Sequence, residues 1–158
     1  MKINHICLVV KDMDRSIKFY QDVLGFELVQ DIEIPVDSGY GWHNPDDLDD
    51  CFGVKGSKSR QAALIDESAI AIELQSPVNP EVKPGSSRAA DYGLTGMKEL
   101  AFTVTNIDEE VDRLKKLGVE FRTRIFEFGQ GTLYGCRSIL FYDPDGNVLQ
   151  LVEVSESS

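Results

Sequence analysis

A histidine and three glutamates stand out because each interrupts a strand-like run of apolar residues. They are His5, Glu73, Glu99 and Glu153. If these side chains converged, one neutral imidazole and about three negative charges would share a small, partly buried space, which repulsion and desolvation forbid unless protons or a cation intervene. A divalent metal ion removes this electrostatic cost. Ligation by several oxygens and one nitrogen suits Mn²⁺, Fe²⁺, Ni²⁺, Co²⁺, Mg²⁺ or Zn²⁺, so we expect one such ion as a cofactor.

The four residues belong to two copies of an internal repeat. The apolar run 6–10 is followed by apolar residues at spacings of three and four, and the same pattern returns from 100–104 onward, an offset of 94 residues. Each copy therefore predicts a strand followed by a helix. Suitable capping residues flank both predicted helices: Asp12 or Asp14 and Asn106 or Asp108 at the start, and Gly25 and Gly118 at the end.

Further strand-like runs complete each half. They cover 26–34, 61–65 and 69–74 in the first half, and 119–128, 138–142 and 148–154 in the second. Each half reads βαβββ, so the sequence predicts an α+β fold of two such modules. We expect a single domain with module 1 at about 1–76, a linker rich in Pro, Gly and Ser at about 77–95, module 2 at about 96–155 and a tail at 156–158.

The first half also carries an acidic insertion, roughly 36–59, which is predicted to be a long loop with room for a short helix. Two interpretations stay open: a solvated surface segment, or a lid over a pocket, since long loops in compact domains often serve binding. His43 lies in this insertion. It is either a surface histidine or a contact to a substrate.

Strand geometry places the four polar residues on particular faces, because side chains alternate between the two faces of a strand. In the opening strands His5 and Glu99 correspond at the offset of 94, and their apolar neighbours leave both on the face away from the helix. In the closing strands we place Glu153 in the register of Glu73, at an offset of 80. Each half then contributes two candidate ligands to that face.

Composition argues against several partners. The 158-residue chain carries 27 acidic and 16 basic residues, a net charge of −11, which would repel nucleic acid and an anionic membrane surface. No apolar run approaches the ~20 residues of a membrane helix, and the N-terminus leaves no room for a signal peptide. We therefore expect a cytoplasmic protein that binds neither nucleic acid nor membrane.

Three widely spaced cysteines suit reduced thiols.

Several motifs support a family resemblance. They are Ile3-Asn4-His5-Ile6, the segment 14–20 (DRSIKFY) followed by Leu24-Gly25-Phe26, the run 100–104 (LAFTV) followed by Ile107-Asp108, and the segment 143–147 (DPDGN) before Leu151-Val152-Glu153. Together with the repeated βαβββ plan, they resemble the vicinal oxygen chelate superfamily, which includes glyoxalase I, methylmalonyl-CoA epimerase, extradiol dioxygenases and fosfomycin or bleomycin resistance proteins. The resemblance implies curled mixed sheets around a shared cleft, a small-molecule substrate and a homodimer.

The resemblance also implies a metal ion held by the first and last strands of each module, at positions that match His5, Glu73, Glu99 and Glu153. Members usually have a histidine where this chain has Glu99, so the histidine pair and single carboxylate of the ring-cleaving dioxygenases are absent. Glyoxalase-like isomerase, lyase or epimerase chemistry on a small oxygenated or thioester metabolite is therefore favoured. The ion would stabilise an enediolate or enolate as a Lewis acid, and Glu153 or Glu73 is the expected base.

Two alternatives stay open. A non-catalytic, drug-sequestering protein of the bleomycin-resistance type would use the cleft without metal. An extradiol-type dioxygenase would require ferrous iron and would consume oxygen with a catechol.

Overall fold

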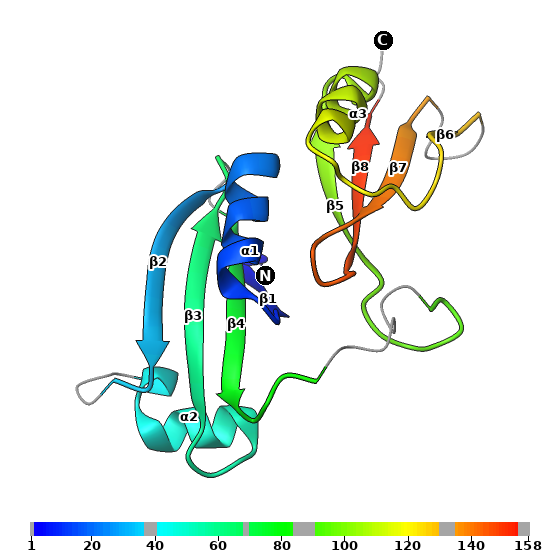
Figure 1. The fold of residues 1–158 in the computed structure, drawn as a ribbon. Coiled ribbons are helices and arrows are strands. Elements are labelled where there is room, and N and C mark those ends of the chain that lie inside the picture. Colours follow the sequence, from blue (N-terminus) through cyan, green and yellow to red (C-terminus); the bar gives the residue numbers. More distant parts are fainter. Residues whose placement is uncertain (1, 37–40, 68–69, 84–90, 130–134, 155–158) are drawn as a thin grey trace. The chain divides into compact units, whose positions relative to one another are not determined.

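The computed structural model describes residues 2–36, 41–67, 70–83, 91–129 and 135–154. The chain divides into two compact units, residues 1–84 and 85–158, and the division falls inside the segment 77–95 that the sequence suggests as a linker. Each unit is a four-stranded mixed sheet with a helix on one face (Figure 1). The predicted tail, 156–158, lies outside the described residues.

The first unit has two helices and four strands. In chain order these are β1 (His5–Val9), α1 (Met13–Lys18), β2 (Glu27–Ile34), α2 (Pro45–Phe52), β3 (Lys58–Ile65) and β4 (Ala71–Asn79). A π-helical turn, Phe19–Val23, extends α1, and a 3-10 turn, Gly41–His43, precedes α2. The strand order is β1-β4-β3-β2, in which β1 and β4 are parallel and the other neighbours are antiparallel.

The second unit repeats this topology without the insertion. Its elements are β5 (Glu99–Val104), α3 (Ile107–Lys116), β6 (Phe126–Glu127), β7 (Arg137–Tyr142) and β8 (Val148–Glu153). The strand order is β5-β8-β7-β6, and again the first pair is parallel. The predicted α+β class with two βαβββ modules is confirmed.

One predicted strand is wrong for most of its length. The segment 119–128 pairs as a strand only at 126–127, and Phe121 forms an isolated bridge with Phe141. The intervening backbone bonds to β7 through single contacts, such as the N–H of Arg122 to the carbonyl of Leu140 at 2.8 Å. Because no continuous ladder forms, apolar composition alone misled the prediction.

Local signals begin and end the helices as expected. Asp12 and Asn106 each accept a hydrogen bond from the backbone N–H three residues on, at 3.0 and 3.2 Å, which satisfies a free donor of the first turn. Beyond the helices, Gly25 and Gly118 both have φ of +79°. A side chain at either position would be strained, so glycine suits these chain reversals.

The helix of each unit packs against one face of its sheet, and the apolar core lies between them. Buried core residues include Ile17, Tyr20, Leu64, Ile72 and Leu74 in the first unit, and Ile107, Val111, Leu114, Phe141, Leu149 and Leu151 in the second. The opposite face carries His5 and Glu99, which are both exposed. Strand alternation therefore predicted their faces correctly.

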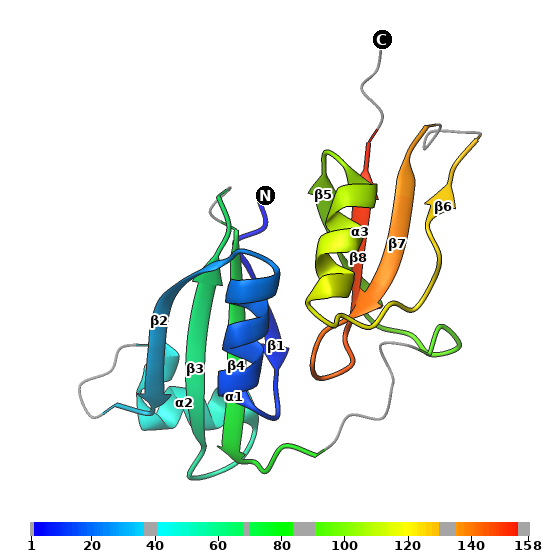
Figure 2. The same cartoon turned by 45° about the horizontal axis from the view of Figure 1, so that its top comes forward.

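The insertion in the first unit contains the short helix that the sequence leaves room for. Asn44 caps α2 by accepting from the N–H of Asp47 at 3.0 Å, and Gly53 ends it with φ of +69°. Leu48 anchors α2, because its side chain is fully buried. Figures 1 and 2 show α2 at the end of the sheet where β2 finishes and β3 begins.

Within the described ranges, no helix is long and apolar enough to cross a bilayer.

Candidate functional site

His5 and Glu73 lie on the same face of the first sheet. In the parallel pair of β1 and β4, His5 aligns with Ala71 and Cys7 aligns with Glu73, so the two predicted ligands are diagonal neighbours on adjacent strands. His5 Nδ1 lies 2.8 Å from the carboxamide oxygen of Asn4. Because that oxygen only accepts, Nδ1 carries the proton of the neutral imidazole, and Nε2 keeps the lone pair that a metal ligand requires.

Two buried amides hold the carboxylate of Glu73. Gln61 donates from Nε2 to Oε2 at 3.1 Å, and Gln75 donates from Nε2 to Oε1 at 3.2 Å. Both amide side chains belong to nearly inaccessible residues, with 4% and 2% exposure. Each carboxylate oxygen accepts one of these bonds and has a second lone pair. The donors are neutral, so they orient Glu73 without cancelling its charge.

Each of the two amides is held in turn by another side chain. Ser59 donates its hydroxyl to Oε1 of Gln75 at 2.7 Å. His43, from the insertion, places Nε2 2.8 Å from Oε1 of Gln61. Glu73 is therefore the centre of a polar network that joins β3, β4 and the insertion.

Cys7 lies beside Glu73 on this face. Burial, followed by the negative charge of Glu73 and a hydrogen bond to it, raises the pKa of the Cys7 thiol to about 12. The thiol is therefore protonated near neutral pH and is a weak nucleophile. Cys7 thus fits a neutral neighbour of Glu73 rather than a reactive cysteine.

Glu99 also meets a neutral donor, in the second unit. The hydroxyl of Tyr92 donates to Oε2 of Glu99 at 3.0 Å. Burial and the nearby carboxylate raise the pKa of Tyr92, so the hydroxyl keeps its proton. The guanidinium of Arg122 stacks over the Tyr92 ring at 5.4 Å from its centroid, which is a favourable cation–π geometry.

The strand register predicted for Glu153 is wrong. In the parallel pair of β5 and β8, Glu99 aligns with Val148 and Ala101 aligns with Gln150. The residue that corresponds to Glu73 is therefore Gln150, at an offset of 77, and the offset of 80 was three residues too long. An odd shift along a strand reverses the face, so Glu153 lies on the face that α3 covers.

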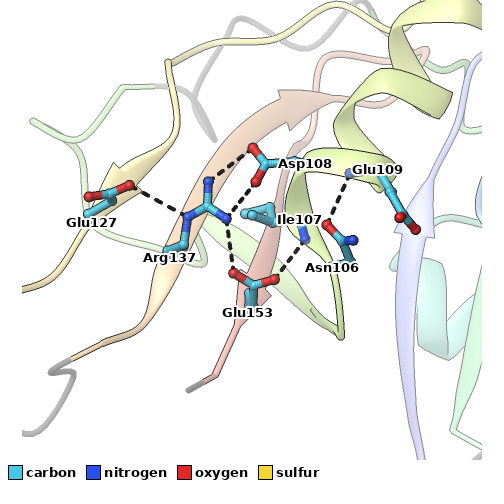
Figure 3. Close-up of polar contacts among 7 residues, drawn as sticks. All are labelled: Asn106, Ile107, Asp108, Glu109, Glu127, Arg137 and Glu153. Carbon is cyan, nitrogen blue, oxygen red and sulfur yellow. Dashed lines mark hydrogen bonds and ion pairs between the residues drawn. The ribbon is translucent and has the colours of Figure 1, made fainter. Parts of the chain in front are cut away.

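The contacts of Glu153 fit this position (Figure 3). Oε1 accepts from the backbone N–H of Ile107, the first residue of α3, at 3.0 Å, and Oε2 accepts from Arg137 at 3.2 Å. Arg137 also binds both carboxylate oxygens of Asp108, at 2.8 and 3.0 Å, and lies 3.7 Å from Glu127. Glu153 is thus paired with a cation and a helix terminus, on the face of the sheet opposite to that of Gln150.

Each unit thus contains a pair of polar residues at corresponding positions, His5 with Glu73 and Glu99 with Gln150. Among the described residues, no three His, Cys, Asp or Glu side chains form a group able to hold a metal ion. Gln150 was missed although a signal existed. β4 begins at Ala71, and β8 begins at Val148, directly after the turn 143–147. When the first residues of these two strands are aligned, Glu73 pairs with Gln150.

Comparison with known proteins identifies the relatives of this chain. A family model described as "Glyoxalase/Bleomycin resistance protein/Dioxygenase superfamily" matches residues 2–151. YwkD of Bacillus subtilis is 29% identical over 151 residues, which cover 96% of this chain and 95% of YwkD. Lactoylglutathione lyase of Schizosaccharomyces pombe is 28% identical over 163 residues, which cover 99% of this chain but 48% of that enzyme. The chain therefore spans about half the length of the yeast relative.

Solved structures share the fold. A glyoxalase family protein from Bacillus cereus superposes with a TM-score of 0.77 at 22% identity, covering 98% of this chain and 94% of that one. A mutant of the fosfomycin resistance protein FosX from Listeria monocytogenes, complexed with Mn(II) and 1S,2S-dihydroxypropylphosphonic acid, superposes with a TM-score of 0.59 at 22% identity, covering 98% and 93%. At these identities the likeness establishes the architecture.

Proposed function

Because the chain belongs to the glyoxalase/bleomycin resistance protein/dioxygenase superfamily, also called the vicinal oxygen chelate superfamily, we propose that it is a metal-dependent enzyme of that superfamily. Its activity is glyoxalase-like isomerase, lyase or epimerase chemistry on a small oxygenated or thioester metabolite. The proposed ligands of one divalent ion are His5, Glu73, Glu99 and Gln150, with Gln150 in the place first given to Glu153. The observation that carries the proposal is the hydrogen bonding of Glu73 by neutral donors alone.

The partners of a carboxylate indicate what it is available for. An arginine cancels the charge of a carboxylate, as Arg137 does for Glu153. Neutral donors orient a carboxylate and leave its negative charge available for a cation. In the part of the chain that the structure describes, the side chains that bond to Glu73 are neutral: the amides of Gln61 and Gln75 and the thiol of Cys7. Glu73 therefore suits a ligand.

The donor set fits a divalent ion. One imidazole nitrogen, two carboxylates and one carboxamide oxygen carry two negative charges, which a doubly charged ion balances. Mixed oxygen and nitrogen ligation is compatible with Mn²⁺, Fe²⁺, Co²⁺, Ni²⁺, Mg²⁺ or Zn²⁺. The FosX relative is complexed with Mn(II), so Mn²⁺ is the first ion to test.

The side chains have separate roles in the proposed reaction. A bound divalent ion would supply Lewis-acid stabilisation of the negative charge that develops on a substrate oxygen. Glu73 is the proposed base, which takes a proton from the carbon next to the substrate carbonyl. Gln61 and Gln75 hold its two oxygens in place during this transfer, which lowers the cost of orientation. The exposed position of His5 leaves this end of the face accessible to a small molecule.

The test combines metal content with proton exchange. Protein purified without chelator should contain about one equivalent of metal, and His5→Ala should lose it. Hemithioacetals of 2-oxoaldehydes and acyl thioesters should incorporate deuterium from D₂O next to the carbonyl in the presence of the wild type, and Glu73→Gln should abolish this exchange. Protein that contains no metal and has the same stability in EDTA would instead be a ligand-binding protein. Oxygen uptake with Fe²⁺ and a catechol would indicate a dioxygenase.

We also propose that the protein is a homodimer, as the family resemblance implies. Sedimentation equilibrium with and without Mn²⁺ tests this proposal, and a single species at the 17.6 kDa mass of the chain would contradict it.

A further inference from the structure

The insertion reaches the face of the first sheet that carries Glu73. Ser59, Gln61 and Gln75 project from this face, opposite to α1, and yet their exposure is 4% or less. His43 of the insertion contacts Gln61 at 2.8 Å, and its carbonyl accepts from the N–H of Val36 at 2.9 Å, which ties it to the end of β2. At the other end of the face His5 is exposed. Glu73 is half-buried and lies between the covered and the exposed ends.

The directions of the hydrogen bonds in this network are determined by Glu73. An ionised carboxylate only accepts, so the amide nitrogen of Gln61 must face Glu73. The amide oxygen of Gln61 then faces His43, and Nε2 of His43 must carry the proton that it donates. The second amide follows the same logic, since the Ser59 hydroxyl donates to the oxygen of Gln75 and the nitrogen of Gln75 donates to Glu73.

Building on the proposed function, we infer that His43 is a positioning residue for Glu73: its Nε2–H holds Gln61 in the one orientation in which the amide donates to the ligand carboxylate. The insertion is thereby part of the metal centre as well as a cover on the sheet. Ser59, which bonds to Gln75, belongs to strand β3. His43, which bonds to Gln61, belongs to the part of the insertion that lies between β2 and β3.

Loss of the His43 donor has a specific consequence. The oxygen of Gln61 would be left without its buried partner, which is unfavourable. A half-turn of the carboxamide would then place that oxygen against the carboxylate of Glu73, where two acceptors repel each other. Oε2 of Glu73 would lose its donor, and the carboxylate would no longer be preorganised for a cation.

Three variants separate this role from a general effect on the fold. His43→Leu removes the donor. His43→Gln keeps an N–H donor at a similar distance from the backbone. Asn44→Ala is the control within the same insertion, because it removes the cap of α2 and the bond from Asn44 to the Gly41 carbonyl, whereas the side chains of His43 and Gln61 are unchanged.

The experiment has two readouts. The first is the side-chain amide resonances of Gln61 in ¹⁵N-labelled protein without metal, assigned with Gln61→Met. The second is the affinity for Mn²⁺ alone, measured by isothermal titration calorimetry. We expect His43→Leu to shift the Gln61 resonances and to weaken Mn²⁺ binding by about 10- to 100-fold. His43→Gln should restore most of the affinity, and Asn44→Ala should lower thermal stability while the affinity stays at the wild-type value.

The outcomes distinguish the two proposals. If His43→Leu keeps the wild-type resonances and affinity, or if His43→Gln and Asn44→Ala lose as much affinity as His43→Leu, the inference about His43 is overturned and the metal centre stands. If the wild type binds no Mn²⁺ or other divalent ion of the set above, the proposed function is overturned. The resonances alone then decide whether His43 orients Gln61.

Discussion

At the scale of single residues, two glutamates of the same chain show how partners decide a role. Glu73 receives two amide hydrogen bonds from Gln61 and Gln75. Glu153 receives one from a helix N-terminus and one from Arg137. The first arrangement leaves a charge that a cation can use, whereas the second neutralises it. The sequence alone presents both as acidic residues at the ends of similar strands.

The proximity of Cys7 and Glu73 gives a prediction that needs no metal. Because burial and the Glu73 carboxylate raise the pKa of Cys7 to about 12, removal of the charge in Glu73→Gln should lower that pKa. The rate of alkylation by iodoacetamide at pH 8 should then rise about tenfold for each unit by which the pKa falls. Mass spectrometry of Cys7 peptides measures the rate, with free glutathione in the same reaction as the reference. Glu99→Gln, in the other unit, should have no effect, and an equal acceleration in both variants would contradict the assignment.

Two positions on one strand provide the sharpest test of the register. Gln150→Ala should weaken Mn²⁺ binding by at least about tenfold and leave stability nearly unchanged. Glu153→Ala should leave the affinity unchanged but should lower the free energy of unfolding by about 1 kcal/mol, since α3 loses the acceptor of its first N–H. Calorimetric titration and urea unfolding measure the two quantities. The reverse pattern would restore Glu153 as the ligand.

At the scale of elements, both units contain the same ion-pair cluster, in which one arginine of an inner strand lies beside two acidic residues. We call this cluster a clasp. In the first unit Arg60 of β3 binds Asp14 of α1 and Asp31 of β2, at 2.7 Å each. In the second unit Arg137 of β7 binds Asp108 of α3 and lies near Glu127 of β6. Asp14 and Asp108 correspond at the repeat offset of 94. Each clasp therefore fastens the start of a helix and the edge strand to an inner strand.

These clasps predict an acid dependence of stability. Hydrogen bonds from Arg60 hold the pKa of Asp31 below its ordinary value, and those from Arg137 do the same for Asp108. A lowered pKa in the folded state stabilises the protein above the unfolded pKa, near 4, and this contribution disappears as the pH falls through the folded pKa. Stability should therefore decline below about pH 4, and less steeply in Arg60→Met and Arg137→Met.

Urea unfolding between pH 7 and pH 2 measures this decline. Because the aspartates are exposed, the difference between wild type and variants should be modest and should shrink in high salt. Arg113→Met, which breaks an ion pair within α3, is the control for the loss of an arginine. Parallel curves for wild type and clasp variants would show that the clasps do not couple to protonation.

At the scale of the whole molecule, the proposed ligands belong to both units, His5 and Glu73 to the first and Glu99 and Gln150 to the second. Binding of an ion to the native state raises its stability, by about 2.7 kcal/mol when free metal is 100 times the dissociation constant. Mn²⁺ should therefore raise the unfolding free energy of the wild type, and EDTA should reverse the effect. Both Glu73→Ala and Glu99→Ala should lose this gain. If Glu99→Ala keeps it, the first unit binds the ion without the second.

The sequence by itself determined the features that depend on neighbouring residues. The repeat, both helices with their caps Asp12 and Asn106, and the faces of His5, Glu73 and Glu99 follow from periodicity and local hydrogen bonding. Only the tertiary structure decided which residue of β8 aligns with Ala101. That choice depends on cross-strand hydrogen bonds between segments about 50 residues apart and on connections of unequal length. The same applies to His43, whose partner Gln61 is 18 positions away along the chain, because the path of an irregular insertion leaves no periodic signal in the residues that form it.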